Sequence, residues 1–292
     1  MRRPLSDLKT WKAETQEKGI MRLEGKTALI TGGSRGIGKA IAKRFVEDGA
    51  KIVISDILKK ELKKTADELN ELRAGSTLAC VSDVTNFDDV QKMVAKTVKF
   101  GGKIDILVNN AGIDPGGSIV DIPIEQWKKI LDVNLNGPFY CMRAVIPEMI
   151  KQGGGSIVNI GSLAGVRCLP SMPAYCSSKG GLLQLSAQCA LEYGPQKIRS
   201  NVVAPGATRT EMLVNAMASL SKAINKDAME VLTESVPLRH PAETDEIAGA
   251  VSFLASDDAS FITGAMLLVD GGAAIVDVSG ASVAKAGVGW GV

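Results

Sequence analysis

The regular alternation of two kinds of segment is the feature that most constrains the fold. Short runs that are apolar throughout alternate with longer amphipathic stretches along most of the chain. Fully apolar runs are typical of parallel strands covered on both faces, and their alternation with helical patterns is typical of right-handed βαβ crossovers. The predicted strands are Thr27–Thr31, Lys51–Ser55, Leu78–Val81, Ile104–Asn109, Ser156–Ile160, Ser200–Val203 and Met266–Val269.

The amphipathic stretches between them predict helices, which include Gly38–Asp48, Lys59–Arg73, Phe87–Phe100, Glu125–Lys151, Ala174–Tyr193 and Thr244–Ser256. No repeat at a fixed period is visible, which removes solenoids and propellers. We therefore predict an α/β fold: a single Rossmann-type, doubly wound domain whose parallel sheet has about seven strands flanked by helices. We place this domain at residues 21–274, between an N-terminal extension (1–20) and a C-terminal tail (275–292).

Composition limits the function classes. The formal net charge of +2 is too small to indicate binding to nucleic acid or to a membrane surface. The five cysteines form no C-x-x-C pair, so we expect no disulfide framework and no metal site, and a reducing compartment. The N-terminus lacks the apolar segment of a secretory signal, and no run approaches the roughly 18 apolar residues of a membrane span. These features favour a soluble cytoplasmic protein.

A glycine-rich turn directly follows the first predicted strand. Glycines let the backbone turn tightly and approach a pyrophosphate, and the next helix offers free N–H groups and the positive end of its dipole. The spacing is G-x-x-x-G-x-G and differs from the common G-x-G-x-x-G fingerprint. We expect a dinucleotide to contact Gly32, Ser34, Arg35, Gly36, Ile37 and Gly38.

The choice between NAD and NADP rests on two charged residues. Asp56 ends the second predicted strand, where a carboxylate binds the adenosine ribose hydroxyls and repels a 2′-phosphate. Arg35 in the glycine turn argues for NADP, because an arginine there can contact a 2′-phosphate. We give Asp56 the greater weight and predict NAD as the cofactor, with Ile57 in the same site.

A candidate chemical site lies further along the chain. Tyr175 and Lys179 are four positions apart on a predicted helix, so they share one face. Hydride transfer to a ketone leaves an oxyanion, and a tyrosine can protonate it only if its pKa, about 10 when unperturbed, moves toward the working pH. We expect the Lys179 ammonium to lower the pKa of Tyr175. Ser162, after the fifth predicted strand, would hydrogen-bond the substrate oxygen.

These motifs together resemble the classical short-chain dehydrogenases/reductases. The resemblance covers roughly residues 21 to 274 and rests on Thr31-Gly32-x-x-x-Gly36-Ile37-Gly38, Asn109-Asn110-Ala111-Gly112, Ser162, Tyr175-x-x-x-Lys179 and Pro205-Gly206-x-x-x-Thr210. It implies a Rossmann-type domain that carries both the cofactor and the substrate site. It further implies that Ser162, Tyr175 and Lys179 form the catalytic group. By the same resemblance, Asn134 would hold a water in the proton relay.

The resemblance also implies further contacts. Lys179 would bind the nicotinamide ribose, and Asp83 and Val84 would flank the adenine. Other expected cofactor contacts are Asn110, Ala111, Gly112, Tyr175, Pro205, Gly206, Thr208 and Thr210. Members of the family are usually homotetramers or homodimers, which implies pairing through the helices predicted at Glu125–Lys151 and Ala174–Tyr193.

Residues 207–240 correspond, by the same resemblance, to a substrate lid. Their apolar side chains are spaced for a helical stripe made of Met212, Leu213, Met217, Leu220, Met229 and Leu232. Such a helix either covers the core or lines an adaptable pocket for an apolar or alicyclic ketone. Arg167 and Arg209 are either ordinary solvated or salt-bridged arginines or contacts for an anionic group of the substrate.

Three functions remain open. The leading hypothesis is an NAD(H)-dependent oxidoreductase that interconverts a secondary alcohol and a ketone. A close alternative is an NADPH-dependent reductase of 3-oxoacyl thioesters, and a more distant one is a nucleotide-binding regulator without turnover. The single histidine, His240, lies in a predicted turn before Pro241, so a Ser-His-Asp hydrolase is not expected.

Overall fold

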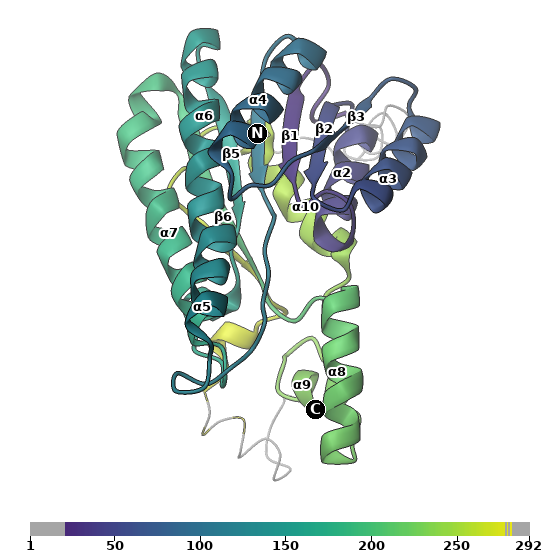
Figure 1. Ribbon diagram of the computed structural model, residues 1–292, viewed down its shortest axis with the longest axis vertical. Helices are drawn as coiled ribbons and strands as arrows, with labels where there is room; N and C mark the ends of the chain where they lie inside the picture. Colours follow the sequence, from purple (N-terminus) through teal and green to yellow (C-terminus); the bar gives the residue numbers. More distant parts are fainter. Residues whose placement is uncertain (1–20, 278, 280, 282–292) are drawn as a thin grey trace, which may run out of the picture.

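The computed structural model of the protein describes residues 21–277, 279 and 281. The extension 1–20 and most of the tail 275–292 lie outside the described residues. The described part forms a sheet of seven parallel strands with helices on both faces, which confirms the predicted fold class (Figure 1). The strands are β1 (Thr27–Thr31), β2 (Lys51–Asp56), β3 (Thr77–Val81), β4 (Ile106–Asn109), β5 (Gly155–Ile160), β6 (Ile198–Pro205) and β7 (Met266–Val269).

The order of the strands fixes where a ligand can bind. Across the sheet they run β3-β2-β1-β4-β5-β6-β7, so the winding reverses between β1 and β4. In open α/β sheets the crevice beyond the carboxyl ends of the strands, at such a switch point, is the usual ligand site. The predicted strands overlap the observed ones, and the differences are confined to their ends.

Two helical layers cover the sheet (Figure 1). One layer consists of α2 (Gly36–Glu47), α3 (Lys59–Leu72) and α10 (Thr244–Ala255). The other consists of α4 (Phe87–Gly101), α6 (Gly137–Gln152) and α7 (Pro173–Tyr193).

Strand β1 shows why its sequence is apolar throughout. Ala28 and Ile30 belong to the core cluster shared with α2, α3 and α10, whereas Leu29 belongs to the cluster shared with α4, α6 and α7. All three side chains are fully buried, because successive residues of a strand point to opposite faces and both faces are covered here. Each large aliphatic side chain buried in this way contributes roughly 1.5–3 kcal/mol.

One predicted helix is interrupted. Instead of a single helix over Glu125–Lys151, the chain forms α5 (Ile124–Leu131), a π-helical turn (Asp132–Asn136) and α6. Pro138 lies in the first turn of α6, and proline has no N–H for an α-type hydrogen bond to the carbonyl of Asn134. The local widening of the helix occurs at the turn that carries a predicted site residue, where π-bulges are frequent.

In the described part of the chain, the predicted lid buries no side chain through its first helix. It forms α8 (Glu211–Ile224) and α9 (Ala228–Thr233), which lie beyond the edge of the sheet in Figure 1. As far as the described residues go, no side chain of α8 is buried. Met212 and Leu220 are 52% and 43% exposed, so the core-covering interpretation of the apolar stripe is wrong for α8.

Candidate active site

Loops from four neighbouring strands meet at the carboxyl edge of the sheet. The glycine turn follows β1, Asn110–Gly112 follow β4, Ser162 follows β5 and Gly206–Thr210 follow β6. Because all the strands are parallel, these loops emerge at one edge although they are far apart in sequence. The topology therefore brings the predicted cofactor and catalytic motifs to one place.

The spacing of the glycine turn follows from close backbone approaches. A Cβ on Gly38 would lie 2.1 Å from the carbonyl oxygen of Gly32, and a Cβ on Gly32 would lie 2.8 Å from Nδ2 of Asn110. Gly32 also has a φ of 65°, a conformation that favours glycine. The Asn110 amide donates to the carbonyls of Thr31 (3.0 Å) and Gly32 (2.9 Å), and the Thr31 hydroxyl accepts from the backbone N–H groups of Asn110 and Ala111 at 3.1 Å each. The turn is thus fixed by the protein itself.

The start of α2 fits an anionic ligand. Arg35 is the N-cap residue; within the described structure it makes no side-chain capping bond, and the first turn of the helix holds no acidic residue. The first N–H groups of the helix are therefore free to bind an anion at the positive end of the dipole. A Cβ on Gly36 would approach only Thr210, at 3.6 Å, so the space above the turn is open. A pyrophosphate fits this arrangement.

The two charged residues that bear on the cofactor choice already have protein partners. Oδ2 of Asp56 accepts from the hydroxyl (2.5 Å) and the N–H (3.3 Å) of Ser34, and Oδ1 accepts from the N–H of Leu58 (3.1 Å). Arg35 instead lies 3.2 Å from the carboxylate of Glu211, at the start of α8. Ile57, which follows Asp56, is 64% exposed. The Asp56 carboxylate is thus fixed to the glycine turn, while Arg35 is directed toward α8.

The predicted catalytic residues converge. Nζ of Lys179 lies 5.7 Å from the centre of the Tyr175 ring and donates to the carbonyl of Ile160 at the end of β5 (2.8 Å). Ser162 caps the short 3-10 turn that follows β5, where its hydroxyl accepts from the N–H of Ala164 (3.1 Å), and it lies close enough to the Tyr175 side chain to lower the pKa of the phenol. Helix α7 and the end of β5 therefore hold the three functional groups together.

The protonation of this group differs from the expectation drawn from sequence. Burial raises the pKa of Tyr175 to about 12; the hydrogen bond from Ser162 lowers this pKa, and the charges of Asp114 and Cys176 raise it. Burial also lowers the pKa of Lys179 to about 8, against the opposing effect of Asp114. The expectation that Lys179 moves the pKa of Tyr175 toward neutrality is not met, because desolvation of the buried phenol dominates. Tyr175 is therefore protonated at neutral pH.

Asn134 is a fully buried link between two parts of the site. Its Oδ1 accepts from the N–H of Ile113 (2.9 Å), and its Nδ2 donates to the carbonyl of Ile113 (2.9 Å) and to the hydroxyl of Ser178 (3.2 Å). The Ser178 hydroxyl in turn donates to the carbonyl of Tyr175 (2.8 Å). Asn134 thus ties the loop after β4 to the helix that carries Tyr175.

The two residues predicted to flank adenine have different environments. Oδ1 of Asp83 accepts from the N–H (2.9 Å) and the hydroxyl (2.8 Å) of Thr85, which makes a local turn. Val84 is buried in the core beside α6, where a Cβ on Gly137 would lie 2.9 Å from it. The structure therefore gives both residues a structural role, and their contact with adenine stays a prediction.

The loop after β6 leads from the sheet into α8. Pro205 ends β6, and a Cβ on Gly206 would lie 2.9 Å from Asp270. The hydroxyl of Thr208 donates to the carbonyl of Gly206 (3.2 Å), and the hydroxyl of Thr210 caps α8 by accepting from the N–H of Leu213 (3.2 Å). The side chains of this loop thus fix the point where α8 begins.

Both arginines considered for an anionic substrate have partners within the protein. Arg209 lies 2.8 Å from the Glu243 carboxylate, and Arg167 donates to the carbonyl of Ala274 (3.0 Å). These contacts support their ordinary structural interpretation.

Sequence reasoning missed two residues beside the catalytic group. Ser178, between Tyr175 and Lys179, bridges Asn134 and the α7 backbone, and Asp114 acts electrostatically on both Tyr175 and Lys179. A signal for Asp114 was present, since it is an acidic residue two positions after the Asn110–Gly112 motif and is immediately followed by proline. No pattern in the sequence pointed to Ser178.

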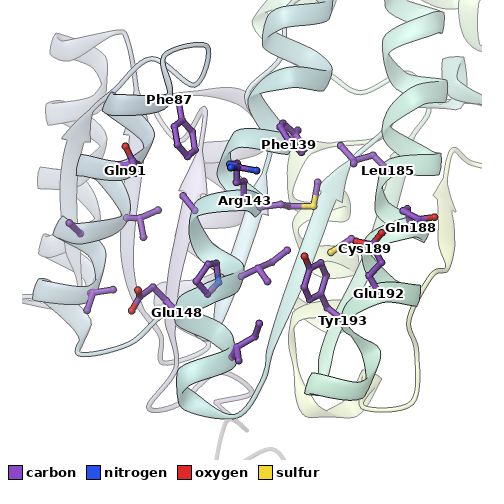
Figure 2. Close-up of a pocket in the computed structure, with 18 residues that line it drawn as sticks. Phe87, Gln91, Phe139, Arg143, Glu148, Leu185, Gln188, Cys189, Glu192 and Tyr193 are labelled. Atoms are coloured by element: carbon purple, nitrogen blue, oxygen red, sulfur yellow. Dashed lines mark hydrogen bonds between the residues drawn. The ribbon is translucent and has the colours of Figure 1, made fainter.

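A groove of about 1100 Å³ lies away from these residues, between α4, α6 and α7 (Figure 2). Its walls include Phe87, Phe139, Leu185 and Tyr193. Over the described residues, no group of three or more His, Cys, Asp or Glu side chains could hold a metal ion. No helix in that same part of the chain is both long and apolar enough to cross a membrane.

Comparisons with known proteins agree with the geometry. A family model described as enoyl-(acyl carrier protein) reductase matches residues 32–274. The 3-oxoacyl-[acyl-carrier-protein] reductase FabG of Thermotoga maritima is 38% identical over 255 residues, which cover 87% of this chain and 100% of that protein.

Two solved structures are also similar to this chain. The crystal structure of levodione reductase has a TM-score of 0.84 and 33% identity, and the match covers 88% of this chain and 100% of that one. A short-chain type dehydrogenase/reductase from Mycobacterium marinum has a TM-score of 0.80 and 34% identity, and the match covers 87% and 97% of the two chains. The chain therefore belongs to the short-chain dehydrogenase/reductase family and is an oxidoreductase that acts on CH–OH groups with NAD(P) as the acceptor.

Proposed function

We propose that the protein interconverts a secondary alcohol and a ketone with NAD(H), and that Tyr175 is the general acid and base. One observation carries this proposal: Ser162, Tyr175 and Lys179 converge at the carboxyl edge of the sheet. Nζ of Lys179 lies 3.6 Å from the position that a Cβ on Gly112 would occupy, so the catalytic group adjoins the loop after β4.

The residues that would hold the cofactor are spread along the same edge. The N–H groups at the start of α2 would bind the pyrophosphate, Asp56 the adenosine ribose and Lys179 the nicotinamide ribose. When bound, the nicotinamide supplies the hydride acceptor for oxidation and the hydride donor for reduction.

Proton transfer falls to Tyr175. In ketone reduction its phenol, protonated at neutral pH, gives its proton to the substrate oxygen, and in alcohol oxidation the phenolate takes the proton back. The Ser162 hydroxyl donates a hydrogen bond to the same oxygen and so keeps the substrate aligned with the cofactor.

We propose that Asn134 takes part in the proton relay with its main-chain carbonyl and not with its side chain. Its side-chain amide is already bonded to Ile113 and Ser178. Because Pro138 lacks an N–H, the Asn134 carbonyl loses the donor that an α-helix would supply, and this carbonyl is our candidate for holding the relay water.

The preference for NAD rests on Asp56 and on the ion pair of Arg35 with Glu211. The first supplies an acceptor for ribose hydroxyls, and the second keeps the guanidinium away from a 2′-phosphate. Separate titrations of NADH and NADPH, followed by nicotinamide fluorescence, test this preference. Tighter binding of NADH that Asp56→Asn weakens would support the assignment. Tighter binding of NADPH would contradict it, and binding of neither cofactor would exclude the dehydrogenase function.

A second candidate function is the NADPH-dependent reduction of 3-oxoacyl thioesters. The 38% identity to FabG of Thermotoga maritima favours it. Turnover of a 3-oxoacyl thioester with NADPH, but not with NADH, would place this function first. A regulator without turnover would bind the cofactor but oxidise no alcohol and reduce no ketone.

We propose that residues 207–240 are the substrate lid. Its first helix starts beside the glycine turn, because Glu211 pairs with Arg35 and Thr210 lies 3.6 Å from the Cβ position of Gly36. The exposed apolar side chains Met212 and Leu220 support an apolar or alicyclic ketone as the substrate.

We also propose that the protein is a cytoplasmic homodimer or homotetramer. Its cysteines are free, as expected of a reducing compartment. The groove between α4, α6 and α7 carries exposed Phe139 together with Arg143 and Glu148 (Figure 2). Apolar and oppositely charged groups on one helix can complement themselves across a two-fold axis. The molar mass from light scattering, compared between wild type and Phe139→Glu, tests this interface.

A further inference from the structure

A carboxylate that the proposed reaction does not use lies beside the catalytic residues. Asp114 is in the loop after β4, and its Oδ1 is buried without a hydrogen-bond partner among the described residues. The other buried polar atoms of this kind there belong to the neutral residues Ser55, Ser82 and Asn109. A buried charged acceptor without a donor is costly, so this oxygen indicates a missing partner.

Hydrogen bonds fix the backbone on both sides of Asp114. On one side, the backbone of Ile113 makes two hydrogen bonds of 2.9 Å with the side chain of Asn134. On the other side, the Gln126 amide donates to the carbonyls of Pro115 (3.2 Å) and Gly116 (2.9 Å), and the N–H of Gly117 donates to the carbonyl of Ser171 (2.8 Å). The side chain of Asp114 therefore starts from a fixed backbone position.

Asp114 lies two residues beyond Gly112, where a Cβ would lie 3.6 Å from Nζ of Lys179, so its loop adjoins the reacting groups. Its charge acts on Tyr175 and on Lys179, and Lys179 in turn acts on Asp114. Tyr175 protonates or deprotonates the substrate oxygen in the proposed reaction. A donor that reaches Asp114 would therefore come from a substituent close to the carbon that is oxidised or reduced.

We propose that Asp114 is a specificity residue that accepts a hydrogen bond from a second hydroxyl of the substrate, on a carbon next to the reacting one. The substrate class is then an apolar or alicyclic vicinal diol and the matching α-hydroxyketone. This proposal rests on the proposed alcohol–ketone function and narrows it.

A neutral hydroxyl suits the site better than a cationic donor. Lys179 already brings a positive charge near Asp114, so a substrate ammonium would meet repulsion from Lys179 as well as attraction to the carboxylate. A hydroxyl supplies the missing hydrogen bond without adding charge. Hydrogen bonds to a charged acceptor are also the stronger ones, which gives such a contact discriminating power.

The experiment compares matched substrates in three variants and the wild type. The pairs are trans-1,2-cyclohexanediol against cyclohexanol for oxidation, and 2-hydroxycyclohexanone against cyclohexanone for reduction; trans-2-aminocyclohexanol tests the cationic donor. The variants are Asp114→Ala, Asp114→Asn and the control Asp121→Asn. Asp121 is an exposed acidic residue of the same loop that bonds to Ser118. NADH affinity, measured for each variant, reports whether it is folded.

We expect wild type and Asp121→Asn to favour the hydroxylated member of each pair in kcat/KM. Asp114→Ala should lower this preference about tenfold or more, the effect of losing a hydrogen bond to a charged group. Asp114→Asn should lower it less, since its amide oxygen still accepts. Equal efficiency within each pair in the wild type, a preference retained by Asp114→Ala, or a preference for the amino alcohol would overturn the assignment of Asp114. Failure of the wild type to turn over any member, although it binds NADH, would overturn the proposed function and this inference with it.

Discussion

The cofactor side and the lid side of the active-site edge are held in different ways. On the cofactor side, Asn110 and Asp56 each bond to the glycine turn, so three strand ends form one rigid unit. On the lid side, α8 buries no side chain among those described and is joined to the glycine turn through Arg35 and Glu211. A cofactor that a whole family uses requires binding residues in fixed positions, whereas a lid over a substrate site must open and close. The proposed lid is thus less tightly packed than the proposed cofactor site.

The largest expected effect is on the rigid side. Tyr175→Phe removes the group that transfers the proton but keeps the ring, so we expect turnover to fall by about 10²–10⁴-fold. NADH affinity should change little, because the glycine turn and Asp56 do not depend on the phenol. Steady-state kinetics and a fluorescence titration on the same preparation measure the two quantities.

The double variant Ser162→Ala/Tyr175→Phe serves as the control. If the two residues act on one substrate oxygen, the double variant should be scarcely slower than Tyr175→Phe alone. Undiminished turnover in Tyr175→Phe would remove Tyr175 from the mechanism.

A matched pair of leucines tests the difference in packing. Leu29 is fully buried in β1, whereas Leu220 on α8 is 43% exposed. Leu29→Ala should lower the free energy of unfolding by about 2–5 kcal/mol, because it leaves a cavity in a close-packed core. Leu220→Ala should change it by only about 0.5 kcal/mol or less. Denaturant unfolding of both variants measures this, and similar losses would mean that α8 is as firmly packed as the sheet.

The same contrast explains what the sequence could predict. Strand β1 and the glycine turn were predictable because their constraints are local: a strand buried on both faces must be apolar, and Gly38 must lack a Cβ that would otherwise meet Gly32. The convergence of Ser162 on Tyr175 followed from one further rule, that parallel strands end at the same edge.

The parts that escaped prediction depend on contacts between distant segments. Whether the apolar stripe on α8 is buried or exposed depends on whether the helix packs against the core. The spacing of the apolar residues in the sequence is the same in both cases. The pKa of Tyr175 depends on how deeply the phenol is buried, which the Tyr-x-x-x-Lys spacing does not encode. The unpaired oxygen of Asp114 results from a loop held by Asn134, Gln126 and Ser171, which a linear pattern does not reveal.

A smaller effect, on cofactor affinity, is expected from a change at the Arg35–Glu211 ion pair, which joins the cofactor side to the lid side. Glu211→Gln removes the partner of Arg35 and leaves the guanidinium free to turn toward a 2′-phosphate. Because the ion pair is exposed, its contribution is modest, at about 0–1 kcal/mol, and we expect NADPH affinity to rise by about fivefold or less. NADH affinity should stay unchanged, since NADH has no 2′-phosphate. Equal changes for the two cofactors would mean that Glu211 affects the lid and not the selectivity of Arg35.

The smallest expected effect is a displacement of the pH profile by the charge of Asp114. Tyr175 is faced by Asp114 from the loop after β4 and by Ser162, Cys176 and Lys179 from the end of β5 and from α7. The negative charge of Asp114 raises the pKa of Tyr175 and of Lys179, so Asp114→Asn should lower both. Alcohol oxidation requires the phenolate, so its rate increases as pH rises through the pKa of Tyr175. In Asp114→Asn this increase should begin at lower pH.

The control variant Asp121→Asn loses the same charge at an exposed position, and we expect its pH profile to match that of the wild type. The comparison uses kcat/KM for cyclohexanol, which lacks the second hydroxyl, so a shift to lower pH reports the charge of Asp114 separately from its hydrogen bond to substrate. A shift to higher pH would mean that the carboxylate acts on Tyr175 through the structure of the loop and not through its charge.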